Sequence, residues 1–266
     1  MMFSDAHNHL HDPRLGDPEP IIAEMRAAGI DRCVVNSTCE EDWPVVESLF
    51  HAHPDLIVPA YGVHPWKAHL AEPGWEERLR ELLVKAPSAA IGECGVDRWI
   101  ESPDMDDQAP IFEAQLRLAR ELDRPVVIHC LKAWQPLFDS FERIGAPQRF
   151  VMHSFNGSLE IARRLLPMGA YFSFSGYFLQ PRKAALLETY LQLPPERVLM
   201  ETDAPDMLPP EEFITHPLPH EMNHPANLPA IVAGFAARAG LPVEEVARRS
   251  SLAFEAFYGH ALRATA

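Results

Sequence analysis

Positive charge is scarce in this sequence. Its 266 residues include 23 lysines and arginines against 38 aspartates and glutamates, which gives a formal net charge of −15. Long nucleic acids bind mainly through many contacts between cationic side chains and phosphates, so this balance argues against a broad basic surface for them. Any contact with such a polymer must therefore be local.

Other features are absent as well. The four cysteines (Cys33, Cys39, Cys94, Cys130) form no CxxC pair, which favours reduced thiols in a cytosolic protein. No apolar stretch approaches the ~20 residues of a membrane span, and no basic patch followed by an apolar run opens the chain. We therefore expect a cytoplasmic location, no membrane contact and no stable protein partner.

Eight short apolar runs have the length of β-strands. They are continuous rather than alternating, which is typical of strands buried on both faces of a parallel sheet. The runs are Met2–Asp5, Arg32–Asn36, Leu56–Tyr61, Ala89–Gly92, Pro125–His129, Arg149–His153, Ala170–Phe174 and Arg197–Glu201.

Helical patterns separate these runs. We expect helices over Glu19–Ala28, Asp42–Ala52, Trp75–Lys85, Ala109–Leu122, Ala133–Ile144, Ser158–Leu166, Arg182–Leu191, Asn227–Ala239 and Val243–Tyr258. Eight alternations in 266 residues predict an α/β fold in one domain, residues 1–266: a single (β/α)8 TIM barrel. An open doubly wound sheet is the alternative, but no GxGxxG or P-loop motif follows any strand.

Potential metal ligands stand at the ends of five of these runs. In a parallel barrel the carboxyl ends of all strands meet in one cup, so these side chains are expected to face each other at the C-terminal face. Four histidines and two carboxylates suffice for two divalent ions. The predicted ligands are His7, His9, Glu93, His129, His153 and Asp203.

Each of these residues also has a simpler explanation. An HxH pair can be structural, and Glu93 could be the acid of a salt bridge. Glu201 could point into the barrel or orient a histidine as a hydrogen-bond acceptor. His64 could contact substrate or leaving group, or it could fix the turn before Pro65. Two histidines on adjacent strands opposite the HxH pair favour a metal site.

Six segments resemble the signature blocks of one family. They are Asp5-Ala6-His7-Asn8-His9-Leu10, Gly62-Val63-His64-Pro65, Ala90 to Asp97, Pro125 to His129, His153 to Ser158 and Glu201 to Pro205. In this order they are similar to the TatD family of metal-dependent hydrolases, within the amidohydrolase-like barrels. The resemblance runs from residue 5 to about residue 258.

The resemblance implies a division of the ligands between two ions. His7, His9 and Asp203 would hold the first ion, His129 and His153 the second, and Glu93 would bridge them. It also implies hydrolysis of phosphodiesters, often by 3′–5′ exonuclease action on DNA, with magnesium, manganese or zinc. Imidazole-rich ligands suit zinc, nickel or iron better than magnesium.

The chain departs from the family pattern in three places, two of which are basic in relatives. Leu131 stands where relatives often have an arginine, with Lys132 next to it. Asn223-His224-Pro225 follows a proline-rich rather than basic segment, and Ala253 replaces a common asparagine. These departures weaken the prediction of DNA as substrate and leave the ligands intact.

The sequence therefore predicts a two-metal phosphodiesterase or deoxyribonuclease that uses a metal-bound hydroxide, with Zn, Mg, Mn or Ni as the two divalent ions. Asp203 and Glu93 are the predicted catalytic residues, and His64, Lys132 and Arg98 are predicted to bind substrate. The substrate is a phosphate ester, either a DNA end or a small molecule. Hydrolysis of a small amide, ester or lactone is the alternative, and a non-catalytic binding protein is disfavoured because all six ligands are present.

Overall fold

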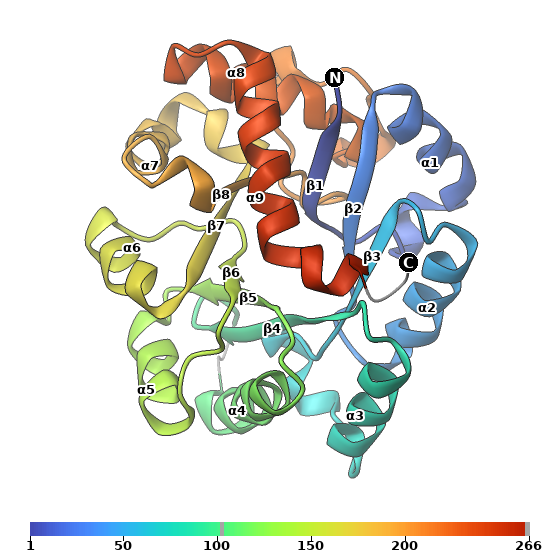
Figure 1. The fold of residues 1–266 in the computed structure, drawn as a ribbon, viewed down its shortest axis with the longest axis vertical. Helices are drawn as coiled ribbons and strands as arrows, with labels where there is room; N and C mark the ends of the chain where they lie inside the picture. Colours follow the sequence, from blue (N-terminus) through green and yellow to red (C-terminus); the bar gives the residue numbers. More distant parts are fainter. Residues whose placement is uncertain (102–103, 264–266) are drawn as a thin grey trace.

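The computed structural model describes residues 1–101 and 104–263, and the strands in them form one parallel sheet in the order β1 to β8 (Figure 1). The (β/α)8 barrel predicted from the sequence is confirmed. The strands are β1 (Phe3–Asn8), β2 (Ile30–Asn36), β3 (Ile57–Tyr61), β4 (Ala90–Asp97), β5 (Val126–Leu131), β6 (Phe150–Met152), β7 (Ala170–Ser175) and β8 (Val198–Glu201).

Helices between the strands form the outer layer of the barrel (Figure 1). Side-chain oxygens of Asp17, Asp104 and Ser158 accept backbone N–H groups at the starts of α1, α4 and α6. The helices are α1 (Pro18–Ala27), α2 (Trp43–Ala52), α3 (Trp75–Lys85), α4 (Met105–Glu121), α5 (Trp134–Ile144), α6 (Leu159–Leu165), α7 (Ala184–Tyr190), α8 (Leu228–Ala239) and α9 (Val243–Arg263).

Several predicted boundaries were wrong. Four strands, β1, β4, β5 and β7, continue past their expected ends, so His7, Glu93 and His129 lie inside β1, β4 and β5. Strand β6 instead stops one residue before His153. Helix α4 begins four residues earlier than expected because Asp104 caps an acidic first turn.

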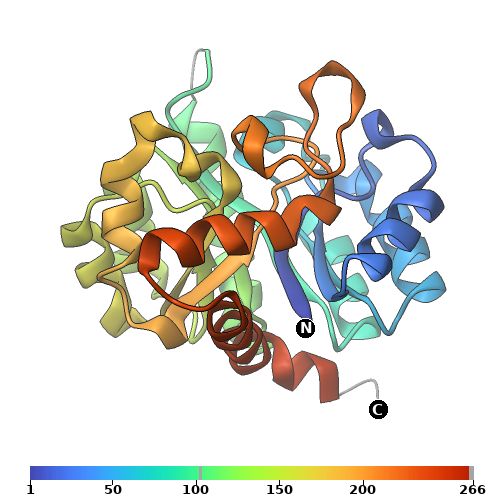
Figure 2. The same ribbon diagram turned by 90° about the horizontal axis from the view of Figure 1, so that it is seen from above.

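Helix α9 closes one end of the barrel. Figure 1 shows it crossing the barrel, and Figure 2 places it at the end opposite the orange segment that follows β8. Its aromatic side chains pack against small and branched residues of the strands, and together these side chains fill the barrel interior at the end that α9 closes. This second hydrophobic cluster includes Ala6, Val34, Val58, Ala60, Ala90, Val127, Val151, Leu199, Phe254, Phe257 and Tyr258.

Side chains complete the junction between β1 and β8. The two strands share no strand register within the described residues. Instead the Asp5 carboxylate accepts Thr202 N–H at 2.9 Å and Thr202 Oγ1–H at 2.6 Å, while Ser250 Oγ of α9 accepts Met200 N–H at 3.0 Å. Burial raises the pKa of Asp5 to about 7, although the hydrogen bonds from Thr202 lower it. The junction is therefore polar and fully buried.

The segment between β8 and α8 is irregular, as predicted for Ala204–Pro225. It contains short 3-10 turns at Glu211–Phe213, Pro219–Glu221 and Pro225–Asn227, and it stands at the mouth of the barrel (Figure 2). No single helix within residues 1–101 and 104–263 is long and apolar enough to cross a membrane.

Candidate metal centre

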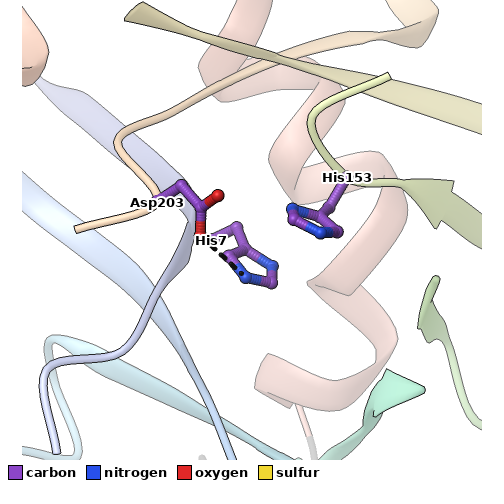
Figure 3. Close-up of side chains that lie close together, drawn as sticks. All are labelled: His7, His153 and Asp203. Carbon is purple, nitrogen blue, oxygen red and sulfur yellow. Dashed lines mark ion pairs between the residues drawn. The ribbon is translucent and has the colours of Figure 1, made fainter. Parts of the chain in front are cut away.

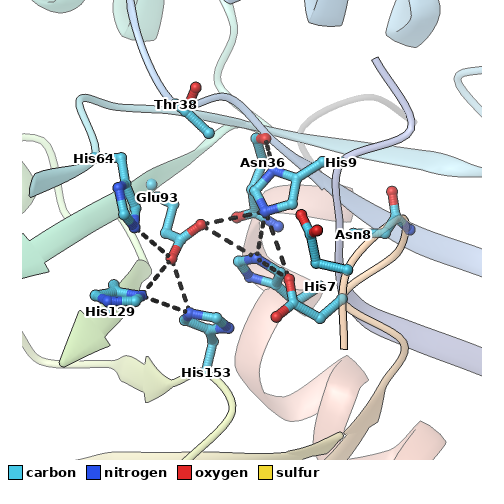
Figure 4. Close-up of polar contacts among 12 residues, drawn as sticks. His7, Asn8, His9, Asn36, Thr38, His64, Glu93, His129 and His153 are labelled. Carbon is cyan, nitrogen blue, oxygen red and sulfur yellow. Dashed lines mark hydrogen bonds and ion pairs between the residues drawn. The ribbon is translucent and has the colours of Figure 1, made fainter. Parts of the chain in front are cut away.

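Glu93 lies at the centre of a buried cluster of histidines and carboxylates. Figure 4 shows its carboxylate between two sets of side chains. Oε2 faces His7 Nε2 at 3.3 Å and His9 Nε2 at 3.4 Å. Oε1 faces His153 Nε2 at 2.8 Å, and two more ring nitrogens contact the same oxygen. Each oxygen of one carboxylate therefore belongs to a different set.

Asp203 completes the first set. Its Oδ1 lies 3.4 Å from His7 Nε2 and 3.5 Å from His9 Nε2, and the two nitrogens are 3.2 Å apart. Figure 3 shows Asp203 and His153 on either side of His7, whose ring stacks on His153 with centroids 4.0 Å apart. Backbone bonds fix this geometry, because Asp203 N–H donates to His7 O at 2.9 Å and His9 N–H donates to Ala204 O at 2.8 Å.

The second set surrounds Glu93 Oε1. His129 Nδ1 lies 3.1 Å and His64 Nε2 lies 3.3 Å from this oxygen. His129 Nδ1 also lies 3.2 Å from His153 Nε2. The structure thus brings all six predicted ligands together and adds His64 to the second set.

In His9 and His129, a hydrogen bond on the side of the ring away from the cluster determines which nitrogen carries the proton. The other nitrogen then presents its lone pair to the cluster. His9 Nδ1 lies 2.8 Å from the carbonyl oxygen of Asn36, which can only accept, so the Nδ1 proton points away from the cluster. His129 Nε2 lies 2.8 Å from Asp97 Oδ2, which accepts in the same way. His9 Nε2 and His129 Nδ1 are therefore the donor atoms available to a cation.

His64 has the opposite arrangement. Its Nδ1 accepts Trp66 N–H at 3.1 Å, which leaves the proton of a neutral ring on Nε2, the atom that faces Glu93. Burial lowers the pKa of His64 to about 4, although the nearby Glu93 carboxylate raises it. In this state His64 is a neutral hydrogen-bond donor rather than a metal ligand.

The spacing of the first set fits a metal ion. Among its four candidate ligand atoms, the five distances that involve an imidazole nitrogen run from 3.2 to 3.5 Å. Four atoms placed tetrahedrally about 2.0–2.1 Å from zinc lie about 3.3–3.4 Å from each other. Three overlapping groups of potential ligands are present within the described residues: His7–His153–Asp203, His7–His9–Glu93 and His64–Glu93–His129.

Opposite charges shift the ionisation of this cluster. Burial raises the pKa of Glu93, but the neighbouring histidines lower it more, so it lies well below its ordinary value. Burial lowers the pKa of His9, but hydrogen bonds to Asp203 and Glu93 move it well above its usual range. A cation that binds here must displace protons, so metal affinity is expected to fall at acidic pH.

The residues predicted to contact substrate lie at different places. His64 is buried within the cluster, as described above. Lys132 is exposed beside the cluster, with its Nζ 3.7 Å from the centroid of the Trp99 ring. Arg98 is exposed too, and neither Lys132 nor Arg98 is among the described residues that line the cavity above the cluster.

Residues without a predicted role support the ligands. Asp97 accepts from His129 and also from Trp66 Nε1–H at 2.7 Å. Asp97 stands four residues after Glu93 and two after Gly95, so all three lie on the same face of β4. This spacing is the feature of the sequence that could have identified Asp97.

Glu201 orients the turn at His153 rather than the ring. It accepts Ser154 N–H at 2.7 Å and Ser154 Oγ–H at 2.6 Å, whereas its Oε1 lies 3.8 Å from His153 Nδ1. That separation is too long for a hydrogen bond, so the interpretation of Glu201 as a direct acceptor for the ring is not what the structure shows.

The chain is similar to known proteins over most of its length. The family model described as TatD related DNase matches residues 4–259. The 3′-5′ ssDNA/RNA exonuclease TatD of Pantoea ananatis is 34% identical over 256 residues, 93% of this chain and 95% of that protein. An uncharacterized metal-dependent hydrolase of Escherichia coli, YjjV, is 31% identical over 208 residues, 77% of this chain and 80% of that protein.

A solved structure agrees with these relatives. The crystal structure of the TatD homolog YjjV from Escherichia coli has a TM-score of 0.88 and 26% identity, and the match covers 97% of this chain and 98% of that chain. The family model spans nearly the whole sequence, and relatives exceed 30% identity along most of their length. This chain therefore belongs to the TatD related DNase family and is a metal-dependent hydrolase.

Proposed function

We propose that this chain is a two-metal phosphodiesterase in which Glu93 bridges the ions. The observation that carries the proposal is the Glu93 carboxylate, whose Oε2 faces His7 and His9 while its Oε1 faces His129 and His153. Asp203 would complete the first site. Nitrogen-rich ligands favour zinc, nickel or iron over magnesium, and near-tetrahedral spacing suits zinc in particular.

Two ions in such a site would supply Lewis acidity and a water of lowered pKa for attack on phosphorus. Asp203 is suited to accept the proton of that water. Burial raises its pKa, but His9 and the other histidines hold it below its usual range, so it is ionised at neutral pH. It is also the only acidic residue among those described as lining the cavity above the cluster.

Two further side chains have roles in this proposal. Neutral His64, with its proton on Nε2, would donate a hydrogen bond to an oxygen of the phosphoryl or leaving group. The Lys132 ammonium, which lies over the Trp99 ring of the cavity lining, would offset the phosphate charge. Lys132 is a better candidate than Arg98 because of this contact with a residue that lines the cavity.

The proposed substrate is the 3′ end of a single-stranded nucleic acid or a short oligonucleotide. The name of the Pantoea relative supports exonuclease action. The net charge of −15 supports recognition of a short end rather than of a long polymer. A cytoplasmic location and one catalytic domain over residues 1–266 stay predictions.

Glu93→Gln tests the bridge. The amide offers one neutral oxygen in place of two anionic ones, so at least one ion should be lost per chain, together with nearly all hydrolysis. Metal content is measured by inductively coupled plasma mass spectrometry and activity with bis(p-nitrophenyl) phosphate. Glu113→Gln, a carboxylate that accepts from Arg143 and Ser140 between α4 and α5, is the control. Full metal content and full activity in Glu93→Gln would contradict the proposal.

Substrate class is tested separately. Protein treated with EDTA and reloaded with one metal at a time is assayed on bis(p-nitrophenyl) phosphate, 3′-labelled single-stranded DNA and a panel of lactones. The expected result is metal-dependent release of nucleotides from the 3′ end. Rapid hydrolysis of lactones without cleavage of any phosphodiester would instead identify a carboxyl-ester or amide hydrolase.

A further inference from the structure

A cavity opens directly above the candidate metal centre. Its volume is about 340 Å³, and His129, His153 and Asp203 form its floor. The walls come from the segments that follow other strands and include Trp99, Tyr177 and Lys183. This volume is at the lower end of the range for small-molecule sites and suits one nucleotide rather than a longer stretch of chain.

One wall presents an unusually exposed aromatic ring. Trp99, on the segment after β4, is 61% exposed, although large aromatic side chains generally bury most of their surface. The Lys132 ammonium lies 3.7 Å from its ring centroid and covers one face. Because Trp99 stays this exposed with Lys132 in place, the indole offers surface on which a planar group can stack. The backbone of Trp99 is fixed independently, because its N–H donates to Asp97 Oδ1.

A second aromatic ring with cations also lines the cavity. Tyr177 lies in the 3-10 turn after β7, and its hydroxyl oxygen accepts Arg182 Nη2–H at 2.7 Å. Lys183 Nζ lies 5.2 Å from the centroid of the same ring. Two aromatic rings, each with its own cation, therefore flank the cavity.

The local charge differs from that of the whole molecule. The chain carries 38 acidic residues, yet Asp203 is the only acidic side chain among the described residues that line the cavity. Lys132, Arg182 and Lys183 contact the two aromatic rings of its walls. An anionic ligand is therefore attracted here and repelled by most of the remaining surface. Aromatic rings interleaved with cations are the combination that binds single-stranded nucleic acids.

We propose that this cavity is a subsite for one unpaired terminal nucleotide, with its base stacked on Trp99 and its phosphate beside Lys132. The proposal rests on the proposed phosphodiesterase function and adds Trp99 as the residue that would hold the terminal base. A base within a duplex is covered by its neighbours and cannot reach the indole, so the subsite selects single-stranded ends. Tyr177 also lines the cavity, whose volume of about 340 Å³ suits one base.

The test compares two single-stranded oligonucleotides that differ only at the 3′ end, which carries either deoxyadenosine or an abasic analogue. Metal-loaded wild-type protein should favour the base-bearing end by about 10- to 100-fold in kcat/KM, the usual effect of one base–aromatic stack. In Trp99→Ala this ratio should approach one, and Trp99→Phe should restore most of it.

Two controls keep the comparison specific. Leu252→Ala removes another exposed apolar side chain, on α9 at the closed end of the barrel, and should leave the ratio unchanged. Lys132→Met should reduce the slope of log affinity against log salt by about 0.7, the contribution of one phosphate contact in a single strand. Lys85→Met, at the end of α3, should leave that slope as it is.

Binding of both oligonucleotides by isothermal titration calorimetry separates the two proposals. A wild-type ratio near one, or an unchanged ratio in Trp99→Ala, overturns the nucleotide subsite. Equal cleavage of blunt duplex and single-stranded ends also overturns it. Preferential binding of the base-bearing end without cleavage of any phosphodiester overturns the proposed function and leaves the subsite standing.

Discussion

Replacing Asp97 with asparagine should weaken one metal site and leave the other nearly intact. Asp97 is fully buried, and its Oδ2 accepts from His129 Nε2 at 2.8 Å and Trp66 Nε1 at 2.7 Å. The charge of this carboxylate holds the His129 proton on Nε2, so the lone pair of Nδ1 faces the cluster. An asparagine keeps one acceptor but brings an N–H group into a site that needs acceptors only.

The size of the effect follows from the bond that is lost. A hydrogen bond to a charged group contributes about 1.5–3 kcal/mol, and each 1.4 kcal/mol is a factor of about ten. We therefore expect one site of Asp97→Asn to bind its ion about 10- to 100-fold more weakly, the range typical of residues that orient metal ligands. The backbone should stay in place, because Gln108 holds Asp97 N–H and its carbonyl oxygen.

Competition with a chromophoric chelator measures the two dissociation constants for zinc or manganese. Asp97→Asn should weaken only one of them, Trp66→Phe should weaken the same site by less, and Glu113→Gln should change neither. Two unchanged constants in Asp97→Asn would refute the assignment of the His129 proton. Equal weakening of both sites would show that Asp97 acts on the whole cluster rather than through His129.

Three further predictions concern stability. Gly95 has φ +145°, and a Cβ there would lie 1.9 Å from a β5 carbonyl oxygen, so Gly95→Ala should lower the free energy of unfolding in urea by more than about 3 kcal/mol. The control Gly240→Ala, whose Cβ would have nothing within 4 Å, should lower it by about 1 kcal/mol, and equal losses would contradict the steric argument. Tyr190→Phe removes a hydroxyl that donates to a backbone carbonyl at 2.6 Å and should lower the free energy of unfolding by about 0.5–1.5 kcal/mol. Tyr61→Phe removes a buried hydroxyl that has no partner among the described residues, so it should leave this free energy unchanged or raise it. The reverse order of unfolding midpoints would refute this reasoning. Burial lowers the pKa of His224 to about 4, so the folded state resists its protonation and loses stability as the pH falls from about 6.5 towards 4. His224→Gln should therefore lose less stability than the wild type over this pH range. An identical pH dependence of unfolding in the two proteins would refute the prediction.

The sequence predicted the barrel because its strands are continuous apolar runs, and it predicted the six side chains that the fold brings together because they stand near the ends of those runs. It misplaced the end of β4 because glycine usually interrupts a strand, whereas Gly92 and Gly95 here lie within it at positive φ. It also placed the start of α4 too late because its acidic first turn carries no apolar stripe.

The direction of the hydrogen bonds made by the histidine rings could not be predicted from the sequence. Whether a ring nitrogen carries a proton depends on what lies behind it, such as the Asn36 carbonyl for His9 or the Trp66 N–H for His64. These partners are distant along the chain or follow a turn of unpredictable geometry. The cavity wall formed by Trp99 and Tyr177 likewise joins two segments that periodicity does not connect.

The position of α9 determines when this protein finishes folding during its synthesis. The side chains of Phe254, Phe257 and Tyr258 fill the closed end of the barrel, and Ser250 binds the edge of β8 at its junction with β1. A ribosome makes this helix after all eight strands, so we expect the barrel interior to stay open in a nascent chain until α9 leaves the exit tunnel. We also expect the two parts of the first set of candidate ligands, on β1 and after β8, to come together lastingly only after synthesis has passed α9.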